Sequence, residues 1–313
     1  MRYVVGRVGQ AALVLLAAFT LSFVLLQALP GDALLIKFEN PELGLSSEQI
    51  ADIRQAYGAD VPLVQQYLDS LAGFLRGDLG YSVQYGTPVA RLLADALPAT
   101  ATLAAASFAL AVVLAVGIAA LSYLTPFGWV RGLLRSLPSL FAAVPVFWLA
   151  IVLVQIFSFQ LGLVPVIAPS PAQALILPVL ALAVPIAAPL AQVLIRSIDD
   201  VSLQPFVAVA TAKGAGPRWL LGRTISRNAV LPSLTIAGVL LGELIGGAVV
   251  TETVFGRAGI GRITEQAVSQ QDIPVLQGVV LLAATTFVVV NLVVDLLYPV
   301  LDPRTKQKVG LAA

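Results

Sequence analysis

Long stretches without a charged residue constrain this chain more than any other feature of its sequence. No Asp, Glu, Lys or Arg occurs in the 60 residues from Ser136 to Ile195, and Val8 to Gly31 and Ala96 to Val130 are equally free of charge. About 20 apolar residues suffice for a helix to cross the hydrocarbon core of a bilayer. The mean hydropathy is +0.93 and only 11% of the residues are charged, which is unlike a soluble globular domain. The sequence therefore predicts an all-α membrane protein.

Six transmembrane helices are expected from the apolar stretches and the breaks between them. The segment LGLVPVIAPSPAQ is too rich in Pro and Gly for a helix interior, so it divides the longest stretch into two crossings. The expected crossings are Val8–Gly31 and, roughly, Thr100–Ser122, Leu137–Phe159, Leu175–Ile195, Asn228–Val250 and Ile273–Leu297. Kinks are expected at the prolines of the third and fourth crossings, Pro145, Pro178, Pro185 and Pro189. The length of the first stretch favours a retained anchor over a cleaved signal peptide.

A polar region separates the first two crossings. Residues 32–95 hold nine carboxylates against four basic residues. Ser46 and Gln49 have the spacing of a capping box, which predicts a helix over Ser47–Tyr57, and Pro62 opens a second amphipathic pattern that runs to Leu75. Arg76 and Asp78 are near enough in sequence to form a local ion pair. We expect a small helical domain outside the membrane.

The placement of basic residues predicts the orientation of the chain. Six crossings put both termini on one side, and that side holds twelve Lys and Arg, whereas the other holds six, with twelve Asp and Glu. The first count includes a loop expected around Arg131 and Arg135. Because positively charged loops stay in the cytoplasm, both termini are expected there. The expected parts are the N-terminus with helix 1 (residues 1–31), an extracytoplasmic helical domain (32–95) and a five-helix core (96–313).

Several kinds of chemistry are excluded by residues that the chain lacks. It has no Cys and no His, which removes thiol chemistry, imidazole acid–base catalysis and the usual transition-metal ligands. The phosphate-binding pattern G-x-x-x-x-G-K-[ST] does not occur. We therefore expect no catalytic residue and no metal site.

The longest polar, basic interruption in the C-terminal half is an expected cytoplasmic loop over residues 196–228. Phe206, Val209, Ala210 and Lys213 follow helical spacing, which predicts a short helix over Leu203–Lys213 with a small, mostly apolar face. Gly214 suits the end of that helix, and a turn is expected next at Gly216-Pro217. Two interpretations are open: the helix is a compact peg for a protein partner, or it lies on anionic lipid headgroups.

One carboxylate lies deep inside a predicted crossing. Glu243 is about 14 residues into the fifth crossing, roughly 20 Å from its cytoplasmic end at 1.5 Å per residue. A charge at this depth is costly unless it faces a cavity or a partner. We expect Glu243, with Gly242, Gly246 and Gly247, to lie on the translocation pathway or on an interface with another subunit. The three glycines would also allow close helix packing.

The order of short motifs along nearly the whole chain resembles the permeases of bacterial ABC importers, in the dipeptide/oligopeptide/nickel branch. The loop is similar to that family's EAA-type coupling loop, with ATAKG at Ala210–Gly214 and RNAVLP at Arg227–Pro232. The Glu of the family's motif is replaced by Ala208. The other matching segments are ALPGD, FLRGDLGYS, GTPV, LPAT, VPVFWLA, LGLVP, GGAVVTETVFGRAGIGR and VDLLYPVLDPR, in that order.

This resemblance implies a type I ABC importer permease that moves di- or oligopeptides across the bacterial plasma membrane by alternating access. It implies as partners a second, homologous permease, two cytoplasmic ATPase subunits that bind ATP and Mg, and an extracytoplasmic solute-binding protein. The coupling residues that it implies are Phe206, Ala208, Val209, Ala210, Ala212, Lys213, Gly214 and Arg218. Import of nickel or a metal chelate is the alternative within the same branch. A stand-alone secondary transporter is the alternative from another class.

Overall fold

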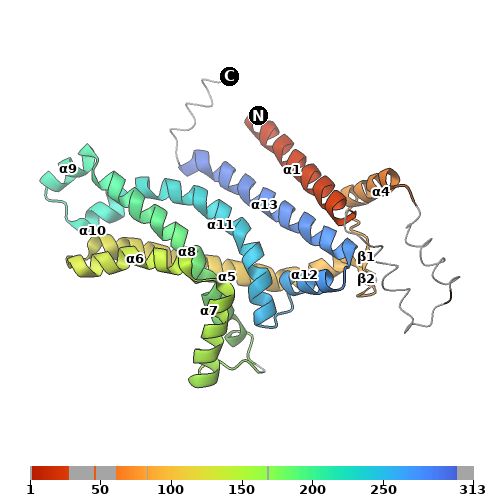
Figure 1. Cartoon of the computed structure of the whole chain (residues 1–313). Coiled ribbons are helices and arrows are strands. Elements are labelled where there is room, and N and C mark those ends of the chain that lie inside the picture. The colour runs from red at the N-terminus through yellow and green to blue at the C-terminus, as the bar shows by residue number, and fades with distance from the viewer. Residues whose placement is uncertain (1, 28–45, 47–60, 83, 168, 302–313) are drawn as a thin grey trace. The chain divides into compact units, whose positions relative to one another are not determined.

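The computed structural model of the chain describes residues 2–27, 46, 61–82, 84–167 and 169–301 (Figure 1). Helices dominate these residues. The predicted helix Ser47–Tyr57 lies outside them. The chain packs as two compact units: unit 1 combines residues 1–98 with 258–288, and unit 2 combines residues 99–257 with 289–313. The predicted division of the chain at residues 31 and 95 stays a prediction.

Within the described residues, five helical segments are long and apolar enough to cross a membrane, and a bent pair brings the number to six if it forms one span. They are Gly6–Leu26 in α1 (Arg2–Gln27), the whole of α5 (Val89–Leu124) and of α8 (Gln173–Ser202), Pro217–Leu244, which ends within α11 (Ser226–Val254), and Ile273–Val293 in α13 (Ile273–Leu301). The bent pair is formed by α6 (Gly128–Ala143) and α7 (Val146–Leu153), the latter continued by the π-helical stretch Val154–Gln160. The prediction of an all-α membrane protein is confirmed.

The helices at two predicted crossings differ from the expected ranges. Helix α5 begins at Val89 rather than near Thr100, and its 36 residues correspond to about 54 Å, which is longer than a bilayer core is thick. The third crossing is not one helix over Leu137–Phe159, because the chain turns by 101° between α6 and α7. The break lies at Val144 and Pro145, both of extended backbone, as expected where a proline disfavours the helical conformation of the residue before it.

The expected basic loop around Arg131 and Arg135 is also wrong, because both residues lie within α6. In contrast, α8 is assigned as one helix of 30 residues that contains Pro178, Pro185 and Pro189. Lipid-buried helices tolerate internal prolines where neighbouring groups satisfy the freed backbone carbonyls.

Besides its long helices, unit 1 contains a small region that is only partly helical. Helix α4 (Leu63–Leu75) follows Pro62, as predicted, and is joined to α5 by a two-stranded antiparallel sheet of β1 (Tyr81–Ser82) and β2 (Thr87–Pro88). Helix α12 (Ile260–Ser269) was not predicted. One buried hydrophobic cluster of unit 1 is formed by Val89, Leu93, Ala96, Ile260, Ile263, Ala267 and Val275.

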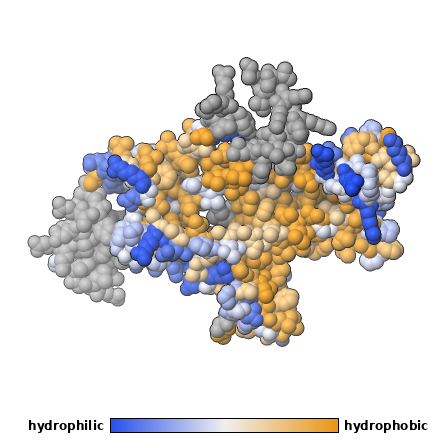
Figure 2. Space-filling view, turned by 180° about the vertical axis from the view of Figure 1, so that it is seen from behind, coloured by the Kyte–Doolittle hydropathy of each residue, from blue (hydrophilic) through white to orange (hydrophobic). Residues whose placement is uncertain are grey.

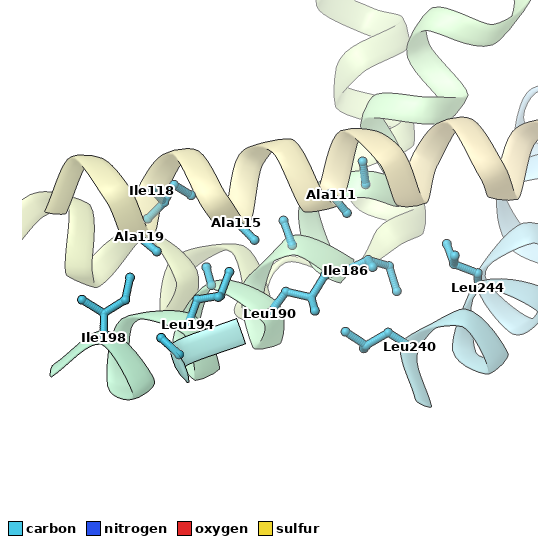
Figure 3. Close-up of a cluster of buried hydrophobic side chains, with 14 of the residues drawn as sticks. Ala111, Ala115, Ile118, Ala119, Ile186, Leu190, Leu194, Ile198, Leu240 and Leu244 are labelled. Carbon is cyan, nitrogen blue, oxygen red and sulfur yellow. The ribbon is translucent and has the colours of Figure 1, made fainter. Parts of the chain in front are cut away.

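Unit 2 is built around α8, which packs against α6, α7 and α11. Figure 3 shows small side chains of α5 facing larger ones of α8, with α11 alongside; the labelled residues are Ala111, Ala115, Ile118, Ala119, Ile186, Leu190, Leu194, Ile198, Leu240 and Leu244. Lipid tails are as apolar as leucine, so hydrophobic burial gives little drive for helices to associate in a membrane. Close packing through small residues supplies it instead.

Candidate functional site

A short helix, α9 (Pro205–Ala212), follows the end of α8 in unit 2. Its existence within the predicted segment Leu203–Lys213 is confirmed. Gly214 has a φ of +87°, its N–H donates to the Thr211 carbonyl, and the Ala215 N–H donates to the Ala210 carbonyl. Glycine tolerates a positive φ without steric cost, so Gly214 allows this helix end and the turn that follows.

One side chain anchors α9 to the rest of unit 2. Val207 is buried and belongs to the same core as Leu220 and Ile225, which lie in the π-helical stretch Leu220–Ile225 between α10 (Pro217–Trp219) and α11. Ala210 is half-buried and packs on this core as well. Sequence reasoning placed Ala210 on the outer face and missed Val207. The sequence signal was present, because Val207 is three residues from Ala210 and on the same helical face.

Large apolar side chains are exposed on α9 and just before it. Leu203, which follows the end of α8, is 85% exposed, and Val209 and Phe206 of α9 are 54% and 46% exposed. The other predicted coupling residues are exposed too: Ala208, Ala212, Lys213, Gly214 and Arg218. Figure 2 shows hydrophilic side chains gathered at the end of unit 2 that carries α9 and α10, next to a mostly hydrophobic surface. The structure thus displays an apolar face within a basic, polar surrounding.

An ion pair lies close to α9 along the chain. The Arg135 Nη2 of α6 is 2.7 Å from the Asp199 Oδ1, in the last turn of α8. Sequence reasoning missed this pair because the residues are 64 positions apart and no local pattern links them.

The four pathway candidates on α11 divide between two environments. Glu243 and Gly246 are exposed, and the exposed positions Val239, Glu243, Gly246 and Val250 follow helical spacing along one stripe. Gly247 faces α8 instead, since a Cβ built on it would lie 2.5 Å from the Leu182 Cδ1. Gly242 is half-buried. Gly247 is therefore a packing position, whereas Glu243 and Gly246 share a face that the described residues of unit 2 leave uncovered.

A second carboxylate of α11 is fully buried, and sequence reasoning overlooked it. Glu252 is 0% exposed, and its Oε1 accepts a hydrogen bond of 2.7 Å from the Thr100 hydroxyl of α5. Nearby in sequence, the Arg257 guanidinium donates to the Ala174 carbonyl of α8 at 3.1 Å. These polar contacts join the C-terminal end of α11 to α5, and the turn after α11 to α8.

A polar network in unit 1 fixes the small sheet to the start of α13. The Ser82 hydroxyl donates to the Asp272 carboxylate at 2.5 Å, and the other oxygen of Asp272 accepts from the Val275 N–H. The Tyr85 hydroxyl donates to the Gln266 side-chain carbonyl of α12. Burial raises the pKa of Tyr85, and the nearby negative charge of Asp272 raises it further, so the phenol is neutral at ordinary pH.

The described residues contain no group of three or more acidic side chains placed to hold a metal ion.

Comparison with known proteins agrees along the whole chain. A family model described as the binding-protein-dependent transport system inner membrane component matches residues 112–307, and a model of the N-terminal part of such membrane components matches residues 1–104. A protein of Brucella abortus (strain 2308), whose name describes a peptide transport system permease, is 35% identical over 97% of this chain and 98% of its own length. The glutathione transport system permease GsiC of Escherichia coli K12 is 31% identical over 98% of this chain and 100% of its own length.

A solved structure shares the fold. The chain from the inward-facing methionine ABC transporter MetNI superposes with a TM-score of 0.52 at 16% identity, covering 67% of this chain and 96% of that chain. At this identity the likeness concerns the fold alone. Together with the two family models and the full-length relatives, it supports the type I importer permease architecture. The chain belongs to the family of inner membrane components of binding-protein-dependent transport systems.

Proposed function

We propose that this chain is the permease subunit of an ATP-driven importer that carries di- or oligopeptides across the plasma membrane. The relatives named as peptide and glutathione permeases support the substrate class. The observation that carries the proposal for this chain is the exposed apolar face of α9, formed by Phe206 and Val209, together with the exposed Leu203 just before the helix. Apolar side chains that gather on an otherwise polar surface are typical of a protein contact.

In this proposal, α9 docks on a cytoplasmic ATPase subunit. Val207 holds the helix to unit 2, so a push on the exposed face is transmitted to the core around α8 and α11. ATP-driven closure of two ATPase subunits would then rock the helix bundles between inward and outward access as rigid bodies. The chain itself performs no covalent chemistry, since ATP and Mg are bound by the ATPase subunits.

The remaining partners follow from the same proposal. A second, homologous permease completes the pathway, and an extracytoplasmic solute-binding protein delivers the peptide. The excess of Lys and Arg on the side of α9 supports a cytoplasmic location for α9 and for both termini.

The exposed stripe of α11 is proposed to face the second permease across the pathway. A carboxylate deep in a membrane is tolerated only beside water or a partner group, so Glu243 on this stripe is unsuited to contact lipid. If the stripe borders the pathway, Glu243 would favour peptides with cationic groups. If it is covered by the second permease, Glu243 would instead contribute to assembly.

Copurification tests the proposal. The chain is isolated in mild detergent from its native host as wild type, as the double variant Phe206→Asp and Val209→Asp, and as the control Leu68→Asp on exposed α4. We expect ATPase subunits with the wild type and the control, and their loss from the double variant, while all three elute as folded, monodisperse protein. Absence of an ATPase from every form, or its retention by the double variant, would contradict the proposal.

A further inference from the structure

Unit 1 contains a cavity of about 410 Å³ that the transport cycle proposed above does not use. Its walls come from α1, α4, the turn after α4 and the first turns of α13, all within unit 1. The residues that define its chemistry are Phe19, Phe23, Phe74, Asp69, Asp78 and Gln277. A cavity of this volume is within the range that small organic ligands occupy.

One wall of the cavity is aromatic and firmly packed. Phe19 stacks on Phe23 and on Phe74 with ring centroids 6.4 and 5.7 Å apart. Tyr67 meets the edges of Phe19 and Phe23, and its hydroxyl is 2.8 Å from that of Thr20. These contacts hold α1 against α4. The wall therefore offers a preformed apolar surface whose ring faces also attract cations.

Two carboxylates give the cavity negative charge. Asp69 and Asp78 are both exposed, so they lie on its water-facing side. Asp78 accepts a hydrogen bond from the Gly80 N–H. Among the described residues neither carboxylate forms an ion pair, and the local pair expected between Arg76 and Asp78 is not found. The charge of both groups is thus left for a cationic ligand.

The cavity wall also contains a buried hydrogen-bond donor. Gln277 lines the cavity from α13, and its amide nitrogen is buried without a hydrogen-bond partner among the described residues. Buried donors in proteins are nearly always paired, because an unpaired one loses the hydrogen bond that it would make to water. A ligand oxygen opposite this nitrogen would replace that hydrogen bond.

We propose that this cavity binds the ammonium end of an amphiphilic primary amine that carries a hydrogen-bond-accepting oxygen close by. The ammonium group lies against Asp69 and Asp78, the acceptor oxygen (a peptide carbonyl or a lipid phosphate oxygen) accepts from the Gln277 amide, and the apolar body covers the rings of Phe19, Phe23 and Phe74. Two sources share this chemistry: the N-terminal residue of an apolar peptide, and an ethanolamine lipid. The peptide source rests on the proposed function, whereas the cavity and its preference for an amine do not.

Equilibrium dialysis with the full chain in detergent tests the inference. The probes are phenylalanyl-glycyl-glycine and lysophosphatidylethanolamine, each beside its N-acetylated form, which lacks the ammonium charge. We expect at least one free amine to bind and its acetylated form to bind roughly 10-fold more weakly, because the charge-assisted contacts are lost. Binding of the peptide alone, the lipid alone or both identifies the source. Failure of both amines to bind, or equal binding of amine and acetylated forms, overturns the inference.

Variants locate the site. Asp69→Asn and Asp78→Asn should each weaken binding roughly 3-fold, and together roughly 10-fold. Gln277→Leu should weaken it as well. The matched control is Asp95→Asn, an exposed carboxylate of α5 outside the cavity, which should bind like the wild type. Equal loss in the control and the cavity variants would place the amine elsewhere. The assay needs no ATPase, so its outcome is independent of the copurification experiment.

Discussion

Arg135 and Asp199 form a 2.7 Å ion pair that ties α6 to the last turn of α8, six residues before α9 begins at Pro205. The two side chains are 40% and 41% exposed. Water screens a pair this open, so its contribution to the free energy of unfolding is small, about 0.2–1 kcal/mol. Its position gives it more importance than its strength, since it fixes the segment that leads into the proposed coupling helix.

Removing this pair should weaken coupling without unfolding the chain. We expect Arg135→Ala and Asp199→Ala each to lower substrate-stimulated ATP hydrolysis by the assembled importer roughly 2- to 5-fold, in line with the small energy of the contact. The charge-exchanged double variant, Arg135→Asp with Asp199→Arg, should recover part of the loss. Hydrolysis assays in proteoliposomes measure this. Single variants that behave like the wild type would show that the pair has no part in coupling.

Neighbouring glycines of α11 should respond differently to a methyl group. An alanine at Gly247 would place its Cβ 2.5 Å from the Cδ1 of Leu182. Because Leu182 is only 1% exposed and has little room to move, we expect Gly247→Ala to lower the free energy of unfolding by about 1–3 kcal/mol. At Gly246 no atom lies within 4 Å of a new Cβ, and alanine favours a helix by up to about 1 kcal/mol. Thermal unfolding of Gly247→Ala and Gly246→Ala in the same detergent compares them. Equal changes in the unfolding midpoint of the two variants would contradict the packing of α11 on α8.

Glu243 should influence which peptides are carried. If its carboxylate borders the pathway, Glu243→Gln lowers uptake of peptides with cationic side chains relative to neutral ones, and assembly with the partner subunits is preserved. Uptake of a matched lysine-containing and neutral peptide pair measures the preference, with Thr253→Val on exposed α11 as the control. Unchanged preference together with weakened assembly would assign Glu243 to the subunit interface.

The small sheet of unit 1 should loosen only at strongly alkaline pH. The pKa of Tyr85 is raised above its ordinary value of 10.0, so the folded state holds the phenolic proton more tightly than the unfolded state does. The stabilisation by this group is fully present below pH 10 and is lost as the pH rises through the raised pKa. Thermal unfolding of wild type and Tyr85→Phe, compared at pH 8 and above pH 10, measures this loss. We expect the difference between their unfolding midpoints to change only above pH 10. A difference that already shrinks between pH 7 and pH 9 would be inconsistent with a raised pKa.

Local sequence patterns predicted most of the long helices, but not which helices pack against one another. The length of the predominantly apolar stretches identified the helices α1, α5, α8, α11 and α13, and turn chemistry at Gly214 and Pro217 gave the short helix between α8 and α11. The break at Pro145 was expected only as a kink, because the size of a bend depends on what the two halves pack against. The start of α5 at Val89 was hidden because Arg91 and Asp95 resemble a polar loop in a hydropathy profile.

Contacts between distant residues had no signal in the sequence. Arg135 and Asp199 are 64 positions apart, and Thr100 and Glu252 are 152 apart. Spacing rules describe neighbours on one helix, so they cannot say which helix lies opposite a charged or polar side chain. The same limit explains why Gly246 and Gly247 were grouped together although they face different surroundings.

The central claim, that α9 contacts an ATPase subunit, is tested most directly by site-specific cross-linking. The chain has no native cysteine, so each introduced thiol is the only one that it contains. Ala208→Cys places a thiol on exposed α9, and Leu68→Cys places one on exposed α4 as the control. In native membranes treated with a short thiol-to-amine cross-linker, we predict a covalent adduct between the Ala208→Cys chain and an ATPase subunit, and none from Leu68→Cys. No ATPase adduct from Ala208→Cys, or an equal one from both positions, would contradict the account.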